Sequence, residues 1–364
     1  MPPKPLQTIA VIGAGNGGHA AAAHMALKGY PVRLYELPRF AENLRPAQEQ
    51  GGIELTGVVG EGFARPEVIT TDVAKAITGA THLLVVTQAL AHEEVARICA
   101  PHVEADQTIL IMPGSGGTLQ FAKTFVDMGV EHKVYLAETV TLPYACRLRG
   151  PAHVHVHQGS AVREVFASLP AKDNEAVLEA VRPAYPMLTP MTHVVEVALY
   201  NPNILLHPIG VIFSLGRIEY TQGEFWMYKE GFTPSVMKIL YALEAEKKAL
   251  LRALDLDPVG FEAFYTYRYE KDWSDFAAVA SKGPASADTR YITEDIPIGM
   301  VFWASLGELL GVPTPTARAL IHISSVIHGT DYWQGGRTVD KLGLSGMTAQ
   351  ELKRCLMEGA AQDP

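Results

Sequence analysis

A glycine-rich turn near the N-terminus constrains the fold of this chain more than any other feature. Gly13-x-Gly15-x-x-Gly18 follows an apolar β-type run at residues 9–12 and leads into an alanine-rich helical stretch at residues 20–27. A dinucleotide site requires this order of strand, turn and helix. Gly13 permits a tight turn, Gly15 lets the backbone approach a pyrophosphate, and Gly18 lets the helix pack against the strand. Because the N–H groups at a helix start attract phosphates, we predict nucleotide binding.

The second predicted strand, residues 32–35, ends next to Glu36. A carboxylate at this position can hold the ribose hydroxyls of NAD and repel the 2′-phosphate of NADP. The sequence therefore predicts that NAD(H) is preferred. Arg39 lies three residues further along. Since an arginine there can accommodate the 2′-phosphate, NADP(H) stays an alternative cofactor.

Length and composition predict a globular protein of two domains. The chain has 364 residues, of which 48% are hydrophobic and 19% charged. Its net charge of −9 gives no electrostatic reason to expect nucleic acid or an anionic membrane as a partner. Neither a signal peptide nor an apolar run of membrane-spanning length is recognisable, and the three cysteines are few and lack CxxC spacing. We expect a cytoplasmic protein, and the sequence does not decide between monomer and homodimer.

Strand and helix patterns alternate in the first half of the chain, which predicts an α/β fold. The candidate strands are apolar along most of their length, as expected of strands buried on both faces. They lie at residues 9–12, 32–35, 83–87, 108–112 and 134–137. This alternation predicts a Rossmann domain with a doubly wound parallel sheet, residues 1–192. Ligands of such sheets bind at the carboxyl ends of the strands.

The second half reads as an all-α domain, residues 193–364. Thr233-Pro234 is a helix start, with Thr as N-cap and Pro in the first helical position. The helix that follows is amphipathic, and we expect Glu244 and Lys248 to form a pair on its polar face. Further helices are expected at residues 301–310 and 316–327.

Two segments of the helical domain carry residues suited to chemistry. His207 lies among aliphatic residues after Asn201-Pro202, and on spacing alone it reads as a core histidine. Residues 288–299 contain Arg290 and Asp295, and on their own they read as a solvated loop. A hydride-transferring enzyme that acts on a carboxylate substrate, however, needs a guanidinium clamp, a histidine proton donor and a carboxylate that orients the histidine.

Several motifs in order along the chain resemble those of the opine dehydrogenase family. Gly-Asn-Gly-Gly-His in the first turn is similar to the family's nucleotide loop, and Leu-His-Pro is similar to its catalytic-histidine motif. Further similar segments are Gly-Phe-Thr-Pro-Ser-Val, Asp-Thr-Arg-Tyr-Ile-Thr-Glu-Asp-Ile, Val-Pro-Thr-Pro and residues 336–346. The resemblance covers nearly the whole chain.

The resemblance implies an NAD(P)H-dependent reductive condensation of an L-amino acid with an α-keto acid, usually pyruvate. It implies that His207 and Asp295 are the acid–base pair and that Arg290 binds the substrate carboxylate. Thr141 is implied as a contact of the keto acid. Cofactor binding then includes Asn16 and Gly17 beside the three motif glycines. The sequence does not identify the amino acid or the stereochemistry of the product.

Two other classes of protein stay open at this point. One is another two-domain nicotinamide-dependent reductase, of the ketopantoate-reductase or glycerol-3-phosphate-dehydrogenase type. These enzymes rely on a lysine of the helical domain. The candidate helix of this chain carries Lys238, Lys247 and Lys248, for which we expect no polar neighbours of an active site. The other is a non-enzymatic NADH sensor, which the presence of His207, Arg290 and Asp295 disfavours.

Three further patterns are given structural interpretations. His153, His155 and His157 alternate along a predicted strand, and we expect a solvated strand and no metal site. The glycine-rich segment at residues 114–117 lacks the Lys-Ser/Thr ending of a phosphate loop, and we expect its backbone to approach the nicotinamide or substrate. Cys146 has no feature of a nucleophile.

Overall fold

The computed structural model describes residues 1–159, 161–272 and 282–359. Two compact units divide the chain: one runs from Met1 to Val197, and the other from Ala198 to Cys355. The division falls within helix α7 (Val194–Leu199), slightly later than residue 192. From Leu356 the chain belongs again to the first unit, where Lys172 Nζ donates a hydrogen bond of 2.5 Å to the carbonyl of Glu358. In this division, the C-terminal residues therefore group with the first unit, whereas the sequence places residues 193–364 together.

The first unit is built on a sheet of eight described strands in the order β12-β11-β8-β7-β6-β1-β2-β5. From β5 to β8 neighbouring strands are parallel, whereas β11 is antiparallel to β8 and parallel to β12. The order reverses direction at β1, so the neighbourhood of β1 and β6 is the switch point where such sheets bind ligands. The bounds are β1 (Ile9–Ile12), β2 (Val32–Tyr35), β5 (Val68–Thr70), β6 (His82–Val85), β7 (Thr108–Ile111), β8 (Tyr135–Thr139), β11 (Glu164–Leu169) and β12 (Leu188–Pro190).

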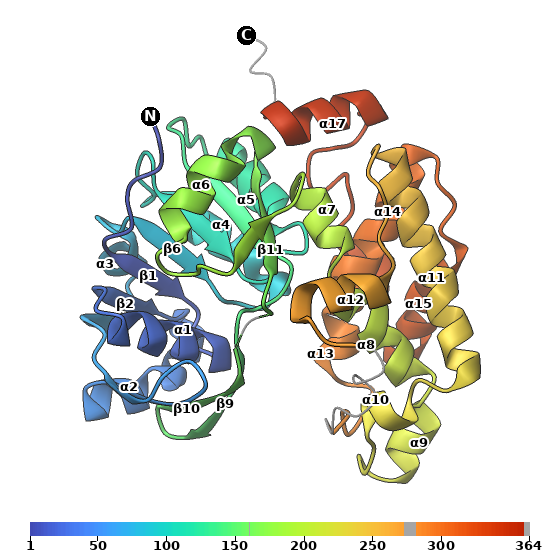
Figure 1. Cartoon of the computed structure of the whole chain (residues 1–364), viewed down its shortest axis with the longest axis horizontal. Coiled ribbons are helices and arrows are strands. Elements are labelled where there is room, and N and C mark those ends of the chain that lie inside the picture. The colour runs from blue at the N-terminus through green and yellow to red at the C-terminus, as the bar shows by residue number, and fades with distance from the viewer. Residues whose placement is uncertain (160, 273–281, 360–364) are drawn as a thin grey trace. The chain divides into compact units, whose positions relative to one another are not determined.

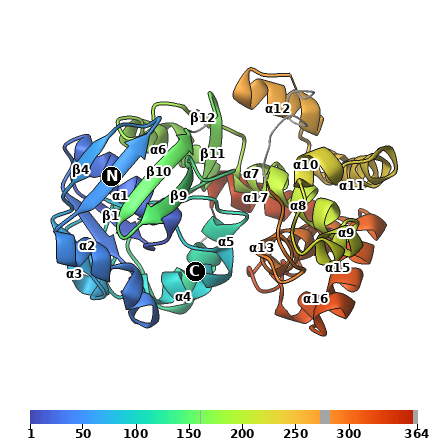
Figure 2. The same cartoon turned by 90° about the horizontal axis from the view of Figure 1, so that it is seen from below.

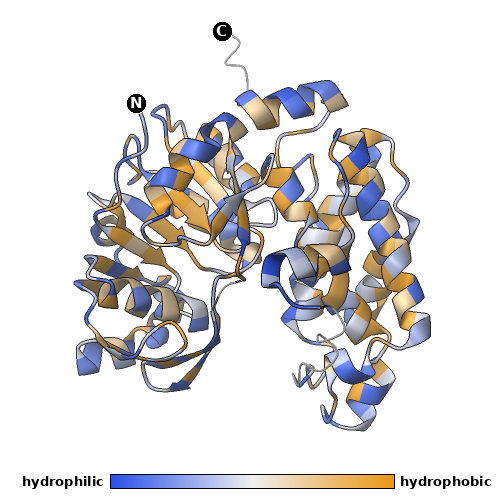
Figure 3. Ribbon diagram, in the orientation of Figure 1, coloured by the Kyte–Doolittle hydropathy of each residue, from blue (hydrophilic) through white to orange (hydrophobic). Residues whose placement is uncertain are grey.

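Both faces of this sheet are buried under helices, as the apolar strands predict. Ile9 and Val11 of β1 belong to one hydrophobic core, and Ala10 and Ile12 belong to another. Helices α1 and α6 contribute to the first core, and α3, α4 and α5 contribute to the second. The strands accordingly stand out as apolar in Figure 3. The bounds are α1 (Asn16–Leu27), α2 (Arg45–Gln50), α3 (Val73–Ile77), α4 (His92–Cys99), α5 (Gly117–Asp127) and α6 (Asn174–Val181), with 3-10 turns η1 (Pro38–Asn43), η2 (Ala89–Ala91) and η3 (Ala171–Asp173).

A second, smaller sheet in the same unit has the order β4-β3-β10-β9. Its bounds are β3 (Ile53–Gly57), β4 (Gly62–Ala64), β9 (Ala145–Gly150) and β10 (His153–Gln158). β9 and β10 form an antiparallel pair, which is visible as adjacent ribbons in Figures 1 and 2. The predicted histidine-bearing strand is therefore present.

The second unit is built of helices and contains no strand of a sheet among its described residues. Its helices are α8 (Pro202–Ile212), α9 (Leu215–Tyr220), α10 (Met227–Glu230), α11 (Pro234–Ala253), α12 (Phe261–Tyr269), α13 (Arg290–Thr293), α14 (Val301–Leu310), α15 (Pro315–His328), α16 (Tyr332–Gly335) and most of α17 (Ala349–Glu358), with a π-helix η5 (Asp295–Met300). The segment predicted to be a loop at residues 288–299 is thus largely helical. No helix among the described residues is both long enough and apolar enough to cross a membrane.

One expectation for α11 is wrong. Glu244 and Lys248 are paired at 3.3 Å, but the Glu244 side chain is only 7% exposed. Its carboxylate accepts a 2.5 Å hydrogen bond from the backbone N–H of Phe261, at the start of α12. Because that N–H has no intrahelical partner, the carboxylate caps α12 from inside the unit. Periodicity alone does not reveal this capping role.

Candidate active site

Helix α8 presents His207 from a buried position in the second unit. Asn201 caps the helix by accepting a hydrogen bond of 3.0 Å from the N–H of Asn203, and Pro202 occupies the first helical position. Pro208 stands inside the helix, where it removes one backbone hydrogen bond. The whole His207 residue is only 5% exposed. A buried imidazole of this kind requires a partner for its polar nitrogens.

That partner comes from a π-helical turn. Thr289 caps the one-turn helix α13, and the chain then widens into η5, whose first residue is Asp295. Isolated π-helical turns are rare and occur often at functional sites. The turn contains Pro297, which has no N–H to give to a regular helix. Asp295 therefore stands at the point where the helical repeat changes.

A glycine allows the two elements to come close together. A Cβ added to Gly299 of η5 would lie 2.3 Å from Cδ1 of Ile204 in α8. Ile204 precedes His207 by one helical turn, so the two side chains share a face of α8. The absence of a side chain at residue 299 thus fixes how closely η5 approaches the histidine-bearing helix.

The resulting contact is a hydrogen bond of 2.7 Å between His207 Nδ1 and Asp295 Oδ2. The Asp295 side chain is 14% exposed and the His207 side chain 7%. An ionised carboxylate only accepts hydrogen bonds, so Nδ1 must carry the hydrogen. The other ring nitrogen, Nε2, is then the atom that can exchange a proton with a substrate.

Arg290 and Tyr291 lie beside this pair. The Tyr291 ring stacks on the His207 imidazole, with centroids 3.8 Å apart and planes inclined by 23°. The Arg290 guanidinium carbon lies 5.8 Å from the centroid of the same Tyr291 ring. Arg290 is exposed, and within the described parts of the chain no carboxylate forms a salt bridge with it. Arg290, His207 and Asp295 are therefore brought together, and Tyr291 is a neighbour that the sequence did not single out.

A half-buried tyrosine belongs to the same neighbourhood. Desolvation raises the pKa of Tyr228, and the nearby groups Tyr291, Tyr269 and Asp295 act in the same direction, opposed by Arg290. Tyr228 also stacks on Phe232, with ring centroids 6.1 Å apart. The phenol thus remains protonated over the ordinary pH range, and the surroundings of His207 are strongly aromatic.

In the first unit, the glycine-rich turn has the geometry that the sequence predicts. Gly13 has a φ of +106°, and a Cβ added to Gly18 would lie 1.7 Å from the carbonyl oxygen of Gly13. Around Gly15, by contrast, a Cβ would meet nothing within 4 Å. Helix α1 has no side-chain cap and no acidic residue in its first turn. The turn therefore fits a dinucleotide, because its helix N-terminus is open to an anion.

The remaining predicted cofactor residues differ in what surrounds them. The buried Glu36 carboxylate accepts hydrogen bonds of 2.9 Å from the backbone N–H groups of Ala14 and Leu37. Asn16 Oδ1 accepts a hydrogen bond from the N–H of Leu148 in β9, which ties the turn to the smaller sheet. A Cβ on Gly17 would collide with Leu142 and Val86, so this glycine serves packing.

Arg39 is engaged by a carboxylate. Both of its terminal nitrogens bond Glu94, one of them at 2.6 Å, and both side chains are substantially exposed. A bidentate pair of this geometry fixes the direction of the guanidinium. Arg39 would have to leave Glu94 before it could hold a 2′-phosphate.

The second glycine-rich segment has a different role from the one expected. Its N–H groups at Gly116 and Thr118 donate to the carboxylate of Glu138, at 2.8 and 2.9 Å. Glu138 is fully buried, and a Cβ on Gly114 would lie 2.3 Å from its side chain. The close backbone approach is therefore made to Glu138. An internal carboxylate occupies the N-terminus of α5, where a ligand phosphate could otherwise bind.

Thr141 follows β8 in the first unit. Its hydroxyl and its backbone N–H each contact the buried carboxylate of Glu164, at 2.9 Å for the hydroxyl. Thr141 thus belongs to a different compact unit from His207, Asp295 and Arg290. Glu138 and Glu164 are two buried carboxylates that sequence reasoning missed.

The patterns set aside in the sequence have ordinary surroundings. His153 and His155 both bond the hydroxyl of Thr56, at 3.0 and 2.9 Å. No group of three or more histidine, cysteine, aspartate or glutamate side chains within the described residues is arranged to hold a metal. Burial raises the pKa of Cys146 to about 11, which makes it a poor nucleophile at neutral pH.

The lysines of α11 do have polar company, contrary to expectation. Lys248 pairs with Glu244, and Lys247 is 2% exposed with its Nζ 4.8 Å from the centroid of the Tyr200 ring. Burial lowers the pKa of Lys247 to about 8. The surroundings of these lysines therefore do not distinguish this protein from lysine-dependent reductases. The distinction depends on which protein family the chain matches.

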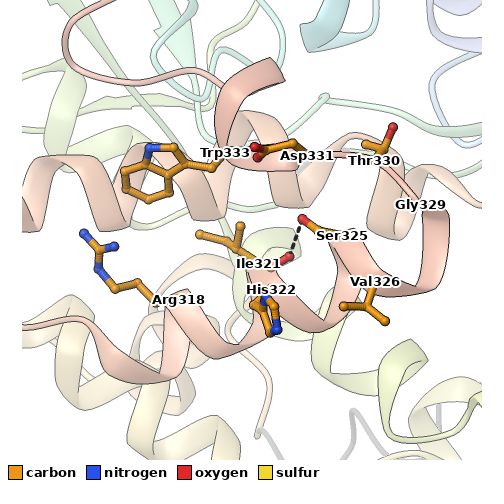
Figure 4. A pocket seen from close by; sticks show the side chains of 9 residues that line it. All are labelled: Arg318, Ile321, His322, Ser325, Val326, Gly329, Thr330, Asp331 and Trp333. Carbon is orange, nitrogen blue, oxygen red and sulfur yellow. Dashed lines mark hydrogen bonds between the residues drawn. The ribbon is translucent and has the colours of Figure 1, made fainter.

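A pocket of about 520 Å³ lies in the second unit, away from the histidine pair. Figure 4 shows that its lining comes from α15 and from the following segment into α16, with Arg318, His322 and Trp333 among its residues. None of His207, Asp295 and Arg290 lines it. The geometry of the catalytic candidates is therefore a better guide to function than the size of this pocket.

The two units of the chain match two different family models. Residues 190–328 match the family model described as NAD/NADP octopine/nopaline dehydrogenase, α-helical domain, and residues 9–164 match ketopantoate reductase PanE/ApbA. An octopine dehydrogenase structure with NADH and agmatine has a TM-score of 0.78 at 22% identity, covering 96% of this chain and 98% of the other. A ketopantoate reductase from Ralstonia eutropha JMP134 has a TM-score of 0.63 at 18% identity, covering 89% and 99%. These structures share the fold.

The match of the helical unit and a curated relative that spans nearly the whole chain together define the class. The protein is an NAD(P)-dependent oxidoreductase of the two-domain type that acts on CH–NH groups. Opine dehydrogenase of Arthrobacter sp. (strain 1C) is 33% identical over 356 residues, covering 95% of this chain and 98% of the relative. The chain belongs to the opine dehydrogenase family, whose reaction is the reductive condensation of an amino acid with an α-keto acid.

Proposed function

We propose that this enzyme condenses an L-amino acid with pyruvate and reduces the product with NADH, using His207 as the acid–base group. The observation that carries the proposal is the 2.7 Å contact between His207 Nδ1 and Asp295 Oδ2, with the exposed Arg290 beside it. Pyruvate is chosen because an octopine dehydrogenase of the same fold has been solved with NADH and pyruvate.

His207 moves protons in this scheme. Because Nδ1 is held by Asp295, Nε2 takes a proton from the ammonium group of the amino acid. The free amine attacks the keto carbon, and the resulting hydroxyl leaves as water after it receives that proton. The bound nicotinamide supplies the hydride that reduces the imine carbon. Ammonium, keto acid, NADH and one proton thus become secondary ammonium, water and NAD⁺.

Asp295 and Arg290 support this chemistry in different ways: Asp295 acts on the imidazole, and Arg290 acts on the substrate. Asp295 keeps the hydrogen on Nδ1 and balances the charge of the imidazolium as it forms. Arg290 presents a planar fork that matches a substrate carboxylate in bidentate geometry. Thr141 is proposed as a further contact of the keto acid, for which its hydroxyl must turn away from Glu164.

NADH is proposed as the preferred cofactor. Glu36 stands at the end of β2, buried and negatively charged, where it repels a 2′-phosphate. Arg39, the residue that could offset this repulsion, is engaged by Glu94. Initial rates with NADH and NADPH test the preference. An equal or higher kcat/KM with NADPH would contradict it.

The activity is tested by following NADH oxidation with pyruvate alone, with each amino acid of a panel alone, and with both together. The proposal expects turnover that requires both substrates and a secondary amine dicarboxylate detected by mass spectrometry. Ketopantoate without any amine serves as the comparison substrate. Reduction of ketopantoate alone, with no dependence on an amino acid, would support a ketopantoate-reductase type of enzyme instead.

A further inference from the structure

The face of the His207 imidazole is covered by an aromatic ring that the acid–base scheme does not use. Asp295 holds one edge of the imidazole through Nδ1, and this single hydrogen bond opposes rotation of the ring about its Cβ–Cγ bond. The Tyr291 ring lies 3.8 Å from the imidazole centroid and nearly parallel to it, at 23°. Stacked rings of this kind attract each other beyond the burial of their area.

The position of Tyr291 is itself fixed by the backbone. Thr289 accepts a hydrogen bond from the N–H of Tyr291 and so caps the single turn α13. That turn packs against both α8 and η5, the elements that carry His207 and Asp295. The guanidinium carbon of Arg290 lies 5.8 Å from the same ring. The same phenol ring therefore lies near both the imidazole and the guanidinium.

We infer that Tyr291 is a positioning residue, whose ring holds the imidazole plane of His207 in the orientation that directs Nε2 toward the reacting nitrogen and oxygen. The inference rests on the proposed function for its kinetic consequence. The face of the Tyr291 ring orients the imidazole, and the Tyr291 hydroxyl has no part in this role. A face of π electrons also attracts the imidazolium cation that forms during turnover.

The kinetic test compares Tyr291→Phe with Tyr291→Leu. Phenylalanine keeps the stacking face, so kcat should stay within about twofold of wild type. Leucine removes it, so kcat should fall by roughly tenfold, the upper range for an aromatic pair, while the KM for NADH stays the same. A Phe variant as slow as the Leu variant would overturn the inference, because the hydroxyl would then be the active part.

A second arm separates positioning from a general loss of structure. In a His207→Ala background, Tyr291→Leu should cost no further activity, because there is no imidazole left to hold. An additional tenfold loss in that background would overturn the inference. Tyr220→Leu is the matched control, since Tyr220 is 88% exposed on α9. This control should keep wild-type kcat.

A spectroscopic arm does not depend on turnover. In histidine-labelled protein, the ring protons of His207, assigned with His207→Ala, should be displaced upfield by the stacked ring. The displacement should persist in Tyr291→Phe and vanish in Tyr291→Leu. Its absence in wild type would overturn the stacking itself. If the upfield displacement is present but no pair of substrates gives turnover, the proposed function is wrong, whereas the stacking of Tyr291 on His207 is confirmed.

Discussion

His207 and Asp295 are 88 residues apart, and their side chains meet at 2.7 Å because two helical segments approach without a side chain at Gly299. Asp295 lies at the start of the π-helical turn, and Gly299 lies within it. The contact between His207 and Asp295 thus depends on the packing of Gly299 against Ile204, and the first prediction concerns that packing.

Gly299→Ala should damage both stability and catalysis. The added methyl would stand 2.3 Å from Ile204, so α8 and η5 must separate. Overpacking of this kind costs about 1–3 kcal/mol in the free energy of unfolding, and a displacement of about 1 Å can cost up to ~100-fold in rate. Thermal unfolding and kcat measure the two effects. Gly216→Ala in α9 is the control, because its Cβ meets nothing within 4 Å. A Gly299→Ala enzyme with the stability and rate of this control would contradict the packing argument.

Gly15→Ala should leave the fold intact and weaken cofactor binding. Gly15 has φ −75° and ψ −166°, which alanine adopts freely, and the space around it is open. The methyl would stand where the pyrophosphate approaches, so the Kd for NADH should rise by at least about tenfold, or ~1.4 kcal/mol. Calorimetric titration with NADH measures this. Unchanged affinity would mean that the pyrophosphate does not approach Gly15.

Arg290→Lys should affect the keto acid and not the cofactor. Lysine keeps the charge but cannot reproduce the bidentate fork. We expect the KM for pyruvate to rise by about tenfold or more, as a lost charged hydrogen bond costs roughly 1.5–3 kcal/mol. The Kd for NADH, measured in the same preparation, should be unchanged. Wild-type keto-acid kinetics in this variant would remove Arg290 from the substrate site.

Lys247 should make stability depend on alkaline pH. Burial disfavours the charged form and lowers the pKa of Lys247 to about 8 in the folded protein, against an ordinary value of 10.5. Between these values the unfolded chain binds more protons, so the Lys247 contribution to stability rises with pH. The free energy of unfolding of the wild type, measured relative to that of Lys247→Met, should therefore rise by about 3 kcal/mol from pH 7 to pH 10.5. Denaturant unfolding across this range measures it, with Lys238→Met as the exposed control. A difference that does not change with pH would contradict the assignment.

The sequence predicted those parts of the fold that rest on local rules. β1 and β2 begin and end where expected, because strands buried on both faces are apolar along most of their length. The glycine-rich turn was predictable because Gly13 needs a positive φ and Gly18 needs close contact with the carbonyl oxygen of Gly13. The proposed roles of His207, Asp295 and Arg290 rest on a family resemblance, since their spacing alone favoured a core histidine and a solvated loop.

The parts that escaped prediction depend on contacts between distant segments. Glu138 reaches the start of α5 only because Ser115 and Gly116 adopt positive φ values of 51° and 82°. Glu244 is buried because the first N–H of α12 needs an acceptor. Tyr291 stacks on His207 only because the Thr289-capped turn α13 packs against α8. Periodicity and composition do not predict such contacts, because they describe only residues that are close in sequence.

The central claim is that His207 and Asp295 act as one acid–base unit, and a double-mutant cycle on kcat tests it most directly. The reaction followed is NADH oxidation that requires both pyruvate and an amino acid. General acid–base catalysis contributes about 10²–10⁴-fold, so His207→Ala and Asp295→Asn should each lower kcat by that order, with NADH affinity unchanged. The double variant should be no slower than His207→Ala alone, because the pair works as a unit. Losses that simply multiply, or a wild-type kcat in either single variant, would contradict the account.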